Sequence, residues 1–204
     1  MASKIKNPIG ENEQEKLIIK KSSSLLNHVL GYVVNISMIV WFLCYPFNFS
    51  LSLIIPLFNF WILFALGYFI WTFVEYWLHR GPYHHKPETF RVGHMLHHKY
   101  PKALLGVPFY ITTVPIIIIF FLLSSIIGYE TVGSFLAGFW LGYVIYTLLH
   151  HSTHYLSIKL PYLYFVRRHH LQHHVHDDKN FGFTTNLWDI VFRTKYNPKK
   201  KEKD

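Results

Sequence analysis

Long apolar runs separated by short polar connections account for most of this chain. Four stretches carry almost no charge: 25–49, 53–78, 107–127 and 132–149. Their lengths are close to or above the ~20 residues that an α-helix needs to cross the core of a bilayer. Polar residues near Pro46 and Tyr129 mark tight connections within each pair of runs. The pattern therefore predicts an all-α integral membrane protein with four transmembrane helices in two hairpins.

The basic residues divide unequally between the two sides of such a bundle. The connections near Pro46 and Tyr129 contain no Lys or Arg, so all 20 basic residues fall in the N-terminal segment, the 79–106 connection and the C-terminal region. Cytoplasmic segments of membrane proteins carry the excess of Lys and Arg. We therefore expect a multi-pass protein whose 79–106 connection and C-terminal region form a cytoplasmic helical cap.

This arrangement divides the chain into three expected parts. They are a polar cytoplasmic tail over 1–24, a membrane catalytic domain over 25–196 and a basic tail over 197–204. The membrane would be the endoplasmic reticulum in a eukaryote and the inner membrane in a bacterium.

Composition agrees with a membrane protein and narrows its partners. Hydrophobic residues make up 51% of the chain and aromatic residues 19%. The formal charge of +9 resides in the tails and membrane flanks, which favours contact with anionic lipid headgroups over nucleic acid. The single cysteine, Cys44, excludes a disulfide within the chain and is expected to be an ordinary packing residue.

Histidines occur in a pattern that repeats in the two halves of the chain. Each half has a loose histidine pair followed by HxxHH, and these ten residues are His79, His84, His94, His97, His98, His150, His154, His170, His173 and His174. Residues i, i+3 and i+4 share one face of a helix, so we expect each HxxHH to converge on one point. Gly81 and Pro82 lie between the first pair, where a bend must bring the two rings together.

Imidazole is a natural ligand for iron, zinc, copper and nickel. Ten ligands exceed what one ion can hold, and two ions with about five nitrogens each would leave room for water or dioxygen. We therefore predict a dimetal site held by these ten residues, with no catalytic side chain beyond the ligands.

Other polar residues near the motifs have weaker assignments. Glu75 lies one helical turn before His79 and is expected to accept the ring N–H of His79 and so orient it. Asp177 and Asp178, after the last HxxHH, are weaker candidates for the same supporting role. The other histidines are expected to be polar surface or interfacial residues, namely His28, His85, His151, His169 and His176.

The segments around the motifs resemble the fatty acid hydroxylase superfamily, the membrane-bound non-haem di-iron group that includes sterol desaturases and carotenoid hydroxylases. The resemblance covers about residues 60–196 and rests on EYWLHR with HxxxxH, HMLHHKYP, GYVIYTLLHHSTH and RHHLQHHVHDDKNFGFTTNLWDIVFRT. The closing NFGFTTNLWDIVFRT is most similar to the fatty acid and ceramide 2-hydroxylases.

The resemblance implies a cytoplasm-facing site with two iron ions, which activates dioxygen and inserts one oxygen atom into the carbon beside the acyl carbonyl of a fatty acid or ceramide. This chemistry needs a redox metal; zinc, which could occupy the same ligands, is not one. Lipid would enter from the bilayer. The 2-hydroxylases often carry a fused haem-b cytochrome domain, for which this chain has no room. We therefore expect a separate electron donor, either a haem-b cytochrome or a ferredoxin with its reductase.

Two departures from the 2-hydroxylase pattern bear on the substrate. Thr147 stands where an Asp is common, and KYPKALLGVP follows the second motif in place of a KYPxDxxRLVxPP-like pattern. Carotenoid hydroxylation and sterol oxidation or desaturation are thus the alternatives within the superfamily. A metal transporter or metal-storing membrane protein is the alternative of another class, although a transporter should place its ligands within the spans, near the midplane. A catalytically dead relative is a third possibility, and all ten ligand positions being filled speaks against it.

Overall fold

The computed structural model describes residues 25–44, 54–102, 105, 107–156 and 159–198. The predicted tail 1–24 and most of the predicted tail 197–204 lie outside this part of the chain. Within it, every regular element is a helix, in the order α2 (Leu25–Cys44), α3 (Ile54–Arg80), α4 (Glu88–Lys99), α5 (Phe109–Ile127), α6 (Tyr129–Tyr155), α7 (Pro161–Val175) and α8 (Leu187–Val191). The all-α prediction is confirmed.

Three of these helices are long and apolar enough to cross a membrane, over Phe58–Arg80, Phe109–Ile127 and Tyr129–Tyr155. The apolar part of α2, His28–Cys44, is shorter. Large apolar side chains cover the outside of these helices; on α5, for example, Leu122 and Ile126 are 62% and 77% exposed. Such a surface suits hydrocarbon and not water.

The interior of the bundle is built from α2, α5 and α6. Its buried side chains are Met38, Phe42, Ile116, Phe120, Val132, Leu136, Ala137, Trp140 and Val144. Aromatic pairs hold α2 against α5, with the ring centroids of Phe42 and Phe120 5.3 Å apart. The apolar runs read from the sequence thus bury one face among themselves and leave the other outside.

Glycines bring α3 and α6 into close contact. A Cβ atom built on Gly67 would lie 2.0 Å from the Phe135 carbonyl oxygen, and one on Gly138 would lie 1.9 Å from the Phe64 carbonyl oxygen. Further along both helices, a Cβ on Gly142 would lie 2.4 Å from Cδ1 of Trp71. Residue numbers therefore rise together from the Phe64–Gly138 contact to the Trp71–Gly142 contact, so the two helices run in the same direction. Small residues commonly allow membrane helices to approach closely in this way.

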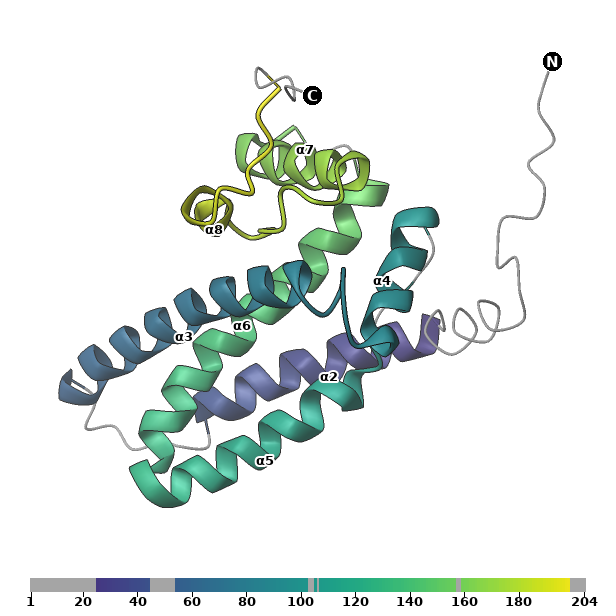
Figure 1. The fold of residues 1–204 in the computed structure, drawn as a ribbon. Coiled ribbons are helices and arrows are strands. Elements are labelled where there is room, and N and C mark those ends of the chain that lie inside the picture. Colours follow the sequence, from purple (N-terminus) through teal and green to yellow (C-terminus); the bar gives the residue numbers. More distant parts are fainter. Residues whose placement is uncertain (1–24, 45–53, 103–104, 106, 157–158, 199–204) are drawn as a thin grey trace, which may run out of the picture.

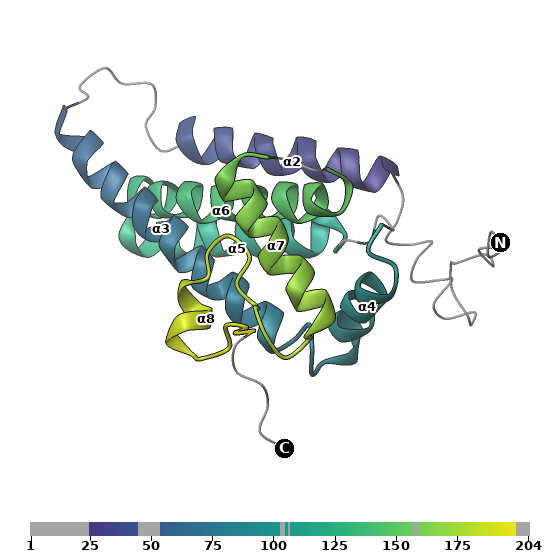
Figure 2. The same ribbon diagram turned by 90° about the horizontal axis from the view of Figure 1, so that it is seen from above.

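The shorter helices gather at one end of the bundle (Figures 1 and 2). In Figure 1, α7 lies across the end of α6. The helix α4 lies beside that end of α6, and α8 lies next to α3. Trp188 of α8 fixes the last of these contacts, because its Nε1 donates to Thr72 Oγ1 at 3.0 Å and its ring lies 4.9 Å from that of Phe73. The two regions predicted to form a cap do lie together.

The α3–α6 contact generates a stability prediction. We expect Gly138→Ala to lower the free energy of unfolding by roughly 3 kcal/mol, because the added methyl group cannot be accommodated without separating the two helices. Gly93→Ala is the matched control: a Cβ there meets no atom within 4 Å, and loss of a helical glycine should stabilise by about 0.5–1 kcal/mol. Thermal unfolding in detergent measures both changes. Equal midpoints for the two variants would contradict the close contact.

Candidate metal centre

The ten repeated histidines come from five places in the chain and meet at the cap end of the bundle. His79 lies in the last turn of α3, and His84 lies in the turn that follows the helix. α4 carries His94, His97 and His98; α6 carries His150 and His154; α7 carries His170, His173 and His174. The expected bend after α3 is present, since the rings of His79 and His84 are 5.4 Å apart.

The rings form two groups whose coordinating nitrogens lie within 4.8 Å of one another. One group contains His79, His84, His94, His98 and His173; the other contains His97, His150, His154 and His170. His174 joins the second group through His170, with 3.0 Å between their Nε2 atoms. We call these the first group and the second group.

Each HxxHH motif is shared between the groups, contrary to the expectation that it converges on one point. In α4, His94 and His98 belong to the first group and His97 to the second. In α7, His173 belongs to the first group while His170 belongs to the second. The reason is the geometry of a helix with 3.6 residues per turn. Residue i+4 lies about 40° from residue i around the helix axis, whereas residue i+3 lies about 60° from residue i in the opposite direction. The motif therefore spans two neighbouring sites.

The contacts within the first group cannot all be hydrogen bonds. Five pairs of Nε2 atoms lie 3.0–3.1 Å apart. The Nδ1 atoms of His79 and His173 face the carbonyl oxygens of Phe181 and Lys179, which only accept, so these neutral rings carry their proton on Nδ1. At most three protons remain for five contacts. Several nitrogen lone pairs are thus directed at one another.

A metal ion resolves this crowding. Metal–imidazole distances of about 2.0–2.1 Å place neighbouring ligands at right angles about 3 Å apart, which is the spacing found here. In the second group, Nε2 of His97 and of His150 are buried without a hydrogen-bond partner, as ligand atoms would be. The donor set therefore fits a metal centre with two positions.

Burial keeps these ligands neutral. Desolvation lowers the pKa of His84 to about 4 and that of His98 to about 2, and it also lowers the pKa of His173 to about 3. Neighbouring histidines contribute to the lowered pKa of His98 and His173. The rings consequently present lone pairs near pH 7, which is the form that binds metal.

The segment after α7 supports the first group, and Glu75 has a different role from the one expected. The Nδ1 of His79 donates to the Phe181 carbonyl at 2.6 Å, so the expected bond to Glu75 is not formed. Instead the buried carboxylate of Glu75 accepts from the backbone N–H groups of Phe183 and Thr184, at 2.5 and 2.9 Å, and from the Thr184 hydroxyl. Glu75 thus fixes the segment around Phe183, and the Phe181 carbonyl of that segment fixes His79.

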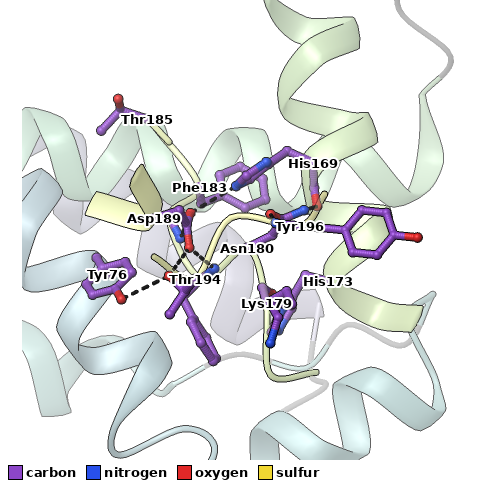
Figure 3. Close-up of polar contacts among 12 residues, drawn as sticks. Tyr76, His169, His173, Lys179, Asn180, Phe183, Thr185, Asp189, Thr194 and Tyr196 are labelled. Carbon is purple, nitrogen blue, oxygen red and sulfur yellow. Dashed lines mark hydrogen bonds and ion pairs between the residues drawn. The ribbon is translucent and has the colours of Figure 1, made fainter. Parts of the chain in front are cut away.

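A second buried carboxylate, Asp189, completes this arrangement (Figure 3). Its two oxygens accept from the backbone N–H groups of Phe181 and Gly182, both at 2.8 Å, and from the Thr194 hydroxyl at 2.7 Å. Its Oδ2 also lies 3.0 Å from His169 Nε2. His169 is 5% exposed, so the expectation of a surface residue was wrong. No spacing in the sequence indicated the pairing of His169 with Asp189.

The other predicted supporting residues lie outside this network. Asp177 and Asp178 are both exposed. The carboxylate of Asp178 pairs with Lys179, and Asp177 acts on His84 only through its charge, which opposes the lowering of that residue's pKa. Neither one has a hydrogen bond to a ligand among the described residues.

Aromatic rings enclose the histidines. Tyr83 stacks on His94 at 5.3 Å between centroids, and Tyr146 stacks on His150 at 5.5 Å. Phe181 contacts His79, at 5.8 Å, while Phe183 contacts His150 and His170, at 5.3 and 4.9 Å. Such an apolar surround limits the access of water to these rings and strengthens electrostatic interactions among them.

Comparison with known proteins identifies related chains. The family model described as Fatty acid hydroxylase matches residues 64–194. The Fatty acid 2-hydroxylase of Rattus norvegicus is 37% identical over 155 residues, covering 70% of this chain and 42% of its own length. The Dihydroceramide fatty acyl 2-hydroxylase FAH1 of Arabidopsis thaliana is 37% identical over 139 residues, covering 64% of this chain and 59% of its own length. The chain thus spans about half the length of these relatives.

A solved structure has the same fold. The chain described as full length scs7p, of which only the hydroxylase domain is visible, aligns with a TM-score of 0.67 and 27% identity, covering 93% of this chain and 72% of that one. The family match includes α4, α5, α6, α7 and α8 and covers all ten repeated histidines. This chain belongs to the fatty acid hydroxylase family.

Proposed function

We propose that this protein is a membrane-bound di-iron oxygenase that hydroxylates a lipid acyl chain at the carbon next to the carbonyl, with a fatty acid or ceramide as substrate. The observation that carries this proposal is the pair of histidine groups, enclosed by aromatic rings at the end of apolar helices, in a chain of this family. The names of the relatives, which are fatty acid and ceramide 2-hydroxylases, support the substrate class.

The ten histidines would hold two iron ions, five at each position. Bound iron supplies the redox chemistry that activates dioxygen, which zinc in the same ligands would not. The overall reaction converts a C–H bond, dioxygen, two electrons and two protons into an alcohol and water. We expect the electrons to come from a separate redox protein, either a haem-b cytochrome or a ferredoxin with its reductase.

The protein's own side chains would bind and position the lipid. Apolar faces of α3 and α5 are open to the bilayer, so an acyl chain can approach laterally without crossing water. Tyr83, Tyr146, Phe181 and Phe183 pack against the ligand rings and keep water from the site. In this arrangement the fold provides orientation and exclusion of water, and the metal centre provides reactivity.

The proposal includes a topology. All four long helices, α2 among them, would span the membrane as two hairpins within a catalytic domain over 25–196. The histidine groups and the tails 1–24 and 197–204 would face the cytoplasm, as the distribution of Lys and Arg favours. The membrane would be the endoplasmic reticulum of a eukaryote or the inner membrane of a bacterium.

Lipid analysis tests the activity. We expect a host expressing the chain to accumulate fatty acids or ceramides with one added oxygen at the carbon beside the carbonyl, detected by mass spectrometry. The double change His97→Ala with His98→Ala removes one ligand from each group and should reduce the product to background. His85→Ala, at an exposed histidine outside both groups, should leave it unchanged.

The outcomes of this experiment separate the alternatives. Oxygen added only to a supplied carotenoid or sterol would keep the family chemistry and reject the acyl substrate. Bound metal without any oxidised lipid, in the presence of a working reductant, would contradict the enzyme and favour metal handling.

Labelling of single cysteines tests the topology. In a Cys44→Ser background, we expect Glu130→Cys to react with an impermeant maleimide from the non-cytoplasmic side of sealed vesicles. Lys86→Cys and Ala2→Cys should react only from the cytoplasmic side. Positions 86 and 130 flank α5 and are exposed, so reaction of both from one side would show that α5 does not span. Reaction of positions 2 and 86 from opposite sides would leave three spans.

A further inference from the structure

The two histidine groups differ in what holds their ligands. In the first group, the Nδ1 atoms of His79 and His173 donate to the carbonyls of Phe181 and Lys179, at 2.6 and 2.7 Å. These two rings are 2% and 0% exposed. A carbonyl acceptor at Nδ1 fixes the tautomer, directs the Nε2 lone pair inward and raises its basicity.

The segment that provides these carbonyls is itself fixed from the opposite side. Asp189 accepts from the N–H groups of Phe181 and Gly182, and Glu75 accepts from those of Phe183 and Thr184. Gly182 makes the tight turn possible, because a Cβ there would lie 2.3 Å from the Thr185 carbonyl oxygen. Two carboxylates thus determine where the carbonyls point.

Asn180 adds a further anchor to the same segment. Its backbone N–H donates to the Thr194 carbonyl at 2.9 Å, and its side-chain oxygen accepts from the Tyr196 N–H at 2.8 Å. Its φ of 58° lies in the left-handed region, which asparagine tolerates better than most residues. The carbonyls of Lys179 and Phe181 are therefore held on both sides of Asn180.

The second group has less support of this kind. Among the described residues, four of its five rings, His97, His150, His154 and His170, donate to no backbone carbonyl, and Nδ1 of His170 is buried without a partner. The desolvation cost of that N–H is not offset. The fifth ring, His174, is the exception, because it has the His98 backbone as a neighbour.

We infer that the two metal positions are unequal: the first group fills first and retains its ion more tightly, and the second group fills last and releases its ion first. Glu75 and Asp189 are positioning residues for the first ion, acting through the carbonyls of Phe181 and Lys179. The inference rests on the proposed dimetal function. Loss of such supporting contacts typically weakens metal binding by 10–100-fold, so we expect a difference of about tenfold or more between the two positions.

Metal release from the wild-type protein is the primary test. The full chain, purified in detergent with iron bound, is dialysed anaerobically against increasing chelator, and metal content per chain is measured by mass spectrometry. We expect two steps, with a plateau at one ion per chain, whose midpoints differ about tenfold or more in chelator concentration. Release of both ions in a single step would overturn the inference.

Ligand variants assign the steps. His150→Ala removes a ligand of the second group and should leave one ion that resists chelator as the tighter wild-type ion does. His84→Ala removes a ligand of the first group and should lose that resistant ion. The reverse assignment would overturn the inference even if two steps are seen.

Carboxylate variants test the cause. Asp189→Asn and Glu75→Gln should each shift the tighter step toward the weaker one by about 10–100-fold and leave the weaker step in place. Glu88→Gln, at an exposed carboxylate paired with Arg91, should shift neither. If both steps move together, the carboxylates act on the fold and not on the first position.

The result also separates this inference from the proposed function. A purified chain that binds no metal would contradict the dimetal proposal itself. A chain that forms hydroxylated lipid while its two ions leave together would support the proposed function and overturn only the inequality.

Discussion

Repulsion among nitrogen lone pairs is the constraint on which this structure depends. Neutral imidazoles 3.0–3.1 Å apart, with too few protons to bridge them, are unfavourable unless a cation lies between them. Burial makes the requirement stricter, because it disfavours protonation as a way to relieve the repulsion. The helices, the aromatic enclosure and the segment after α7 all serve to hold this otherwise unstable arrangement of donors in place.

The two halves of the sequence repeat one another, yet neither half builds a site alone. The first group takes His173 from the second half, and the second group takes His97 from the first. Each metal ion would therefore cross-link α4 to α7. The rings of the two helices already lie against one another, as His97 and His170 do, and His98 and His173. A sequence repeat that suggests two separate modules therefore produces two histidine groups that each need both halves.

Local rules made the clustered histidines visible in the sequence and did not reveal the contacts that position them. The spacing of HxxHH reports a helical face directly, and the glycine and proline after His79 report a bend. The partners of Glu75 lie 108 and 109 residues away, so only the fold brings them together. Helical spacing suggested His79 as the partner of Glu75, but the backbone N–H groups of a tight turn compete better for a buried carboxylate.

His169 is a second residue whose role could not be predicted from local spacing. It lies next to His170 in a histidine-rich segment, and nothing in the sequence distinguishes it from a surface residue. Its burial follows from the path of residues 176–196, which return under α7 and place Asp189 beside it. That path is set by several long-range contacts at once, and no periodicity in the sequence describes it.

The contact between α3 and α6 sets how His79 and His150 align in the candidate metal centre. Gly67 and Gly138 meet where the two helices are closest, and His79 and His150 each follow their glycine by twelve residues. At 1.5 Å per residue, both ligands stand about 18 Å above that contact. Because the helices run in the same direction, a shift of α3 along α6 would move His79 away from its position beside the histidines of the other helices. The glycines in the bundle therefore affect how the candidate ligands align, although they lie about 18 Å from them.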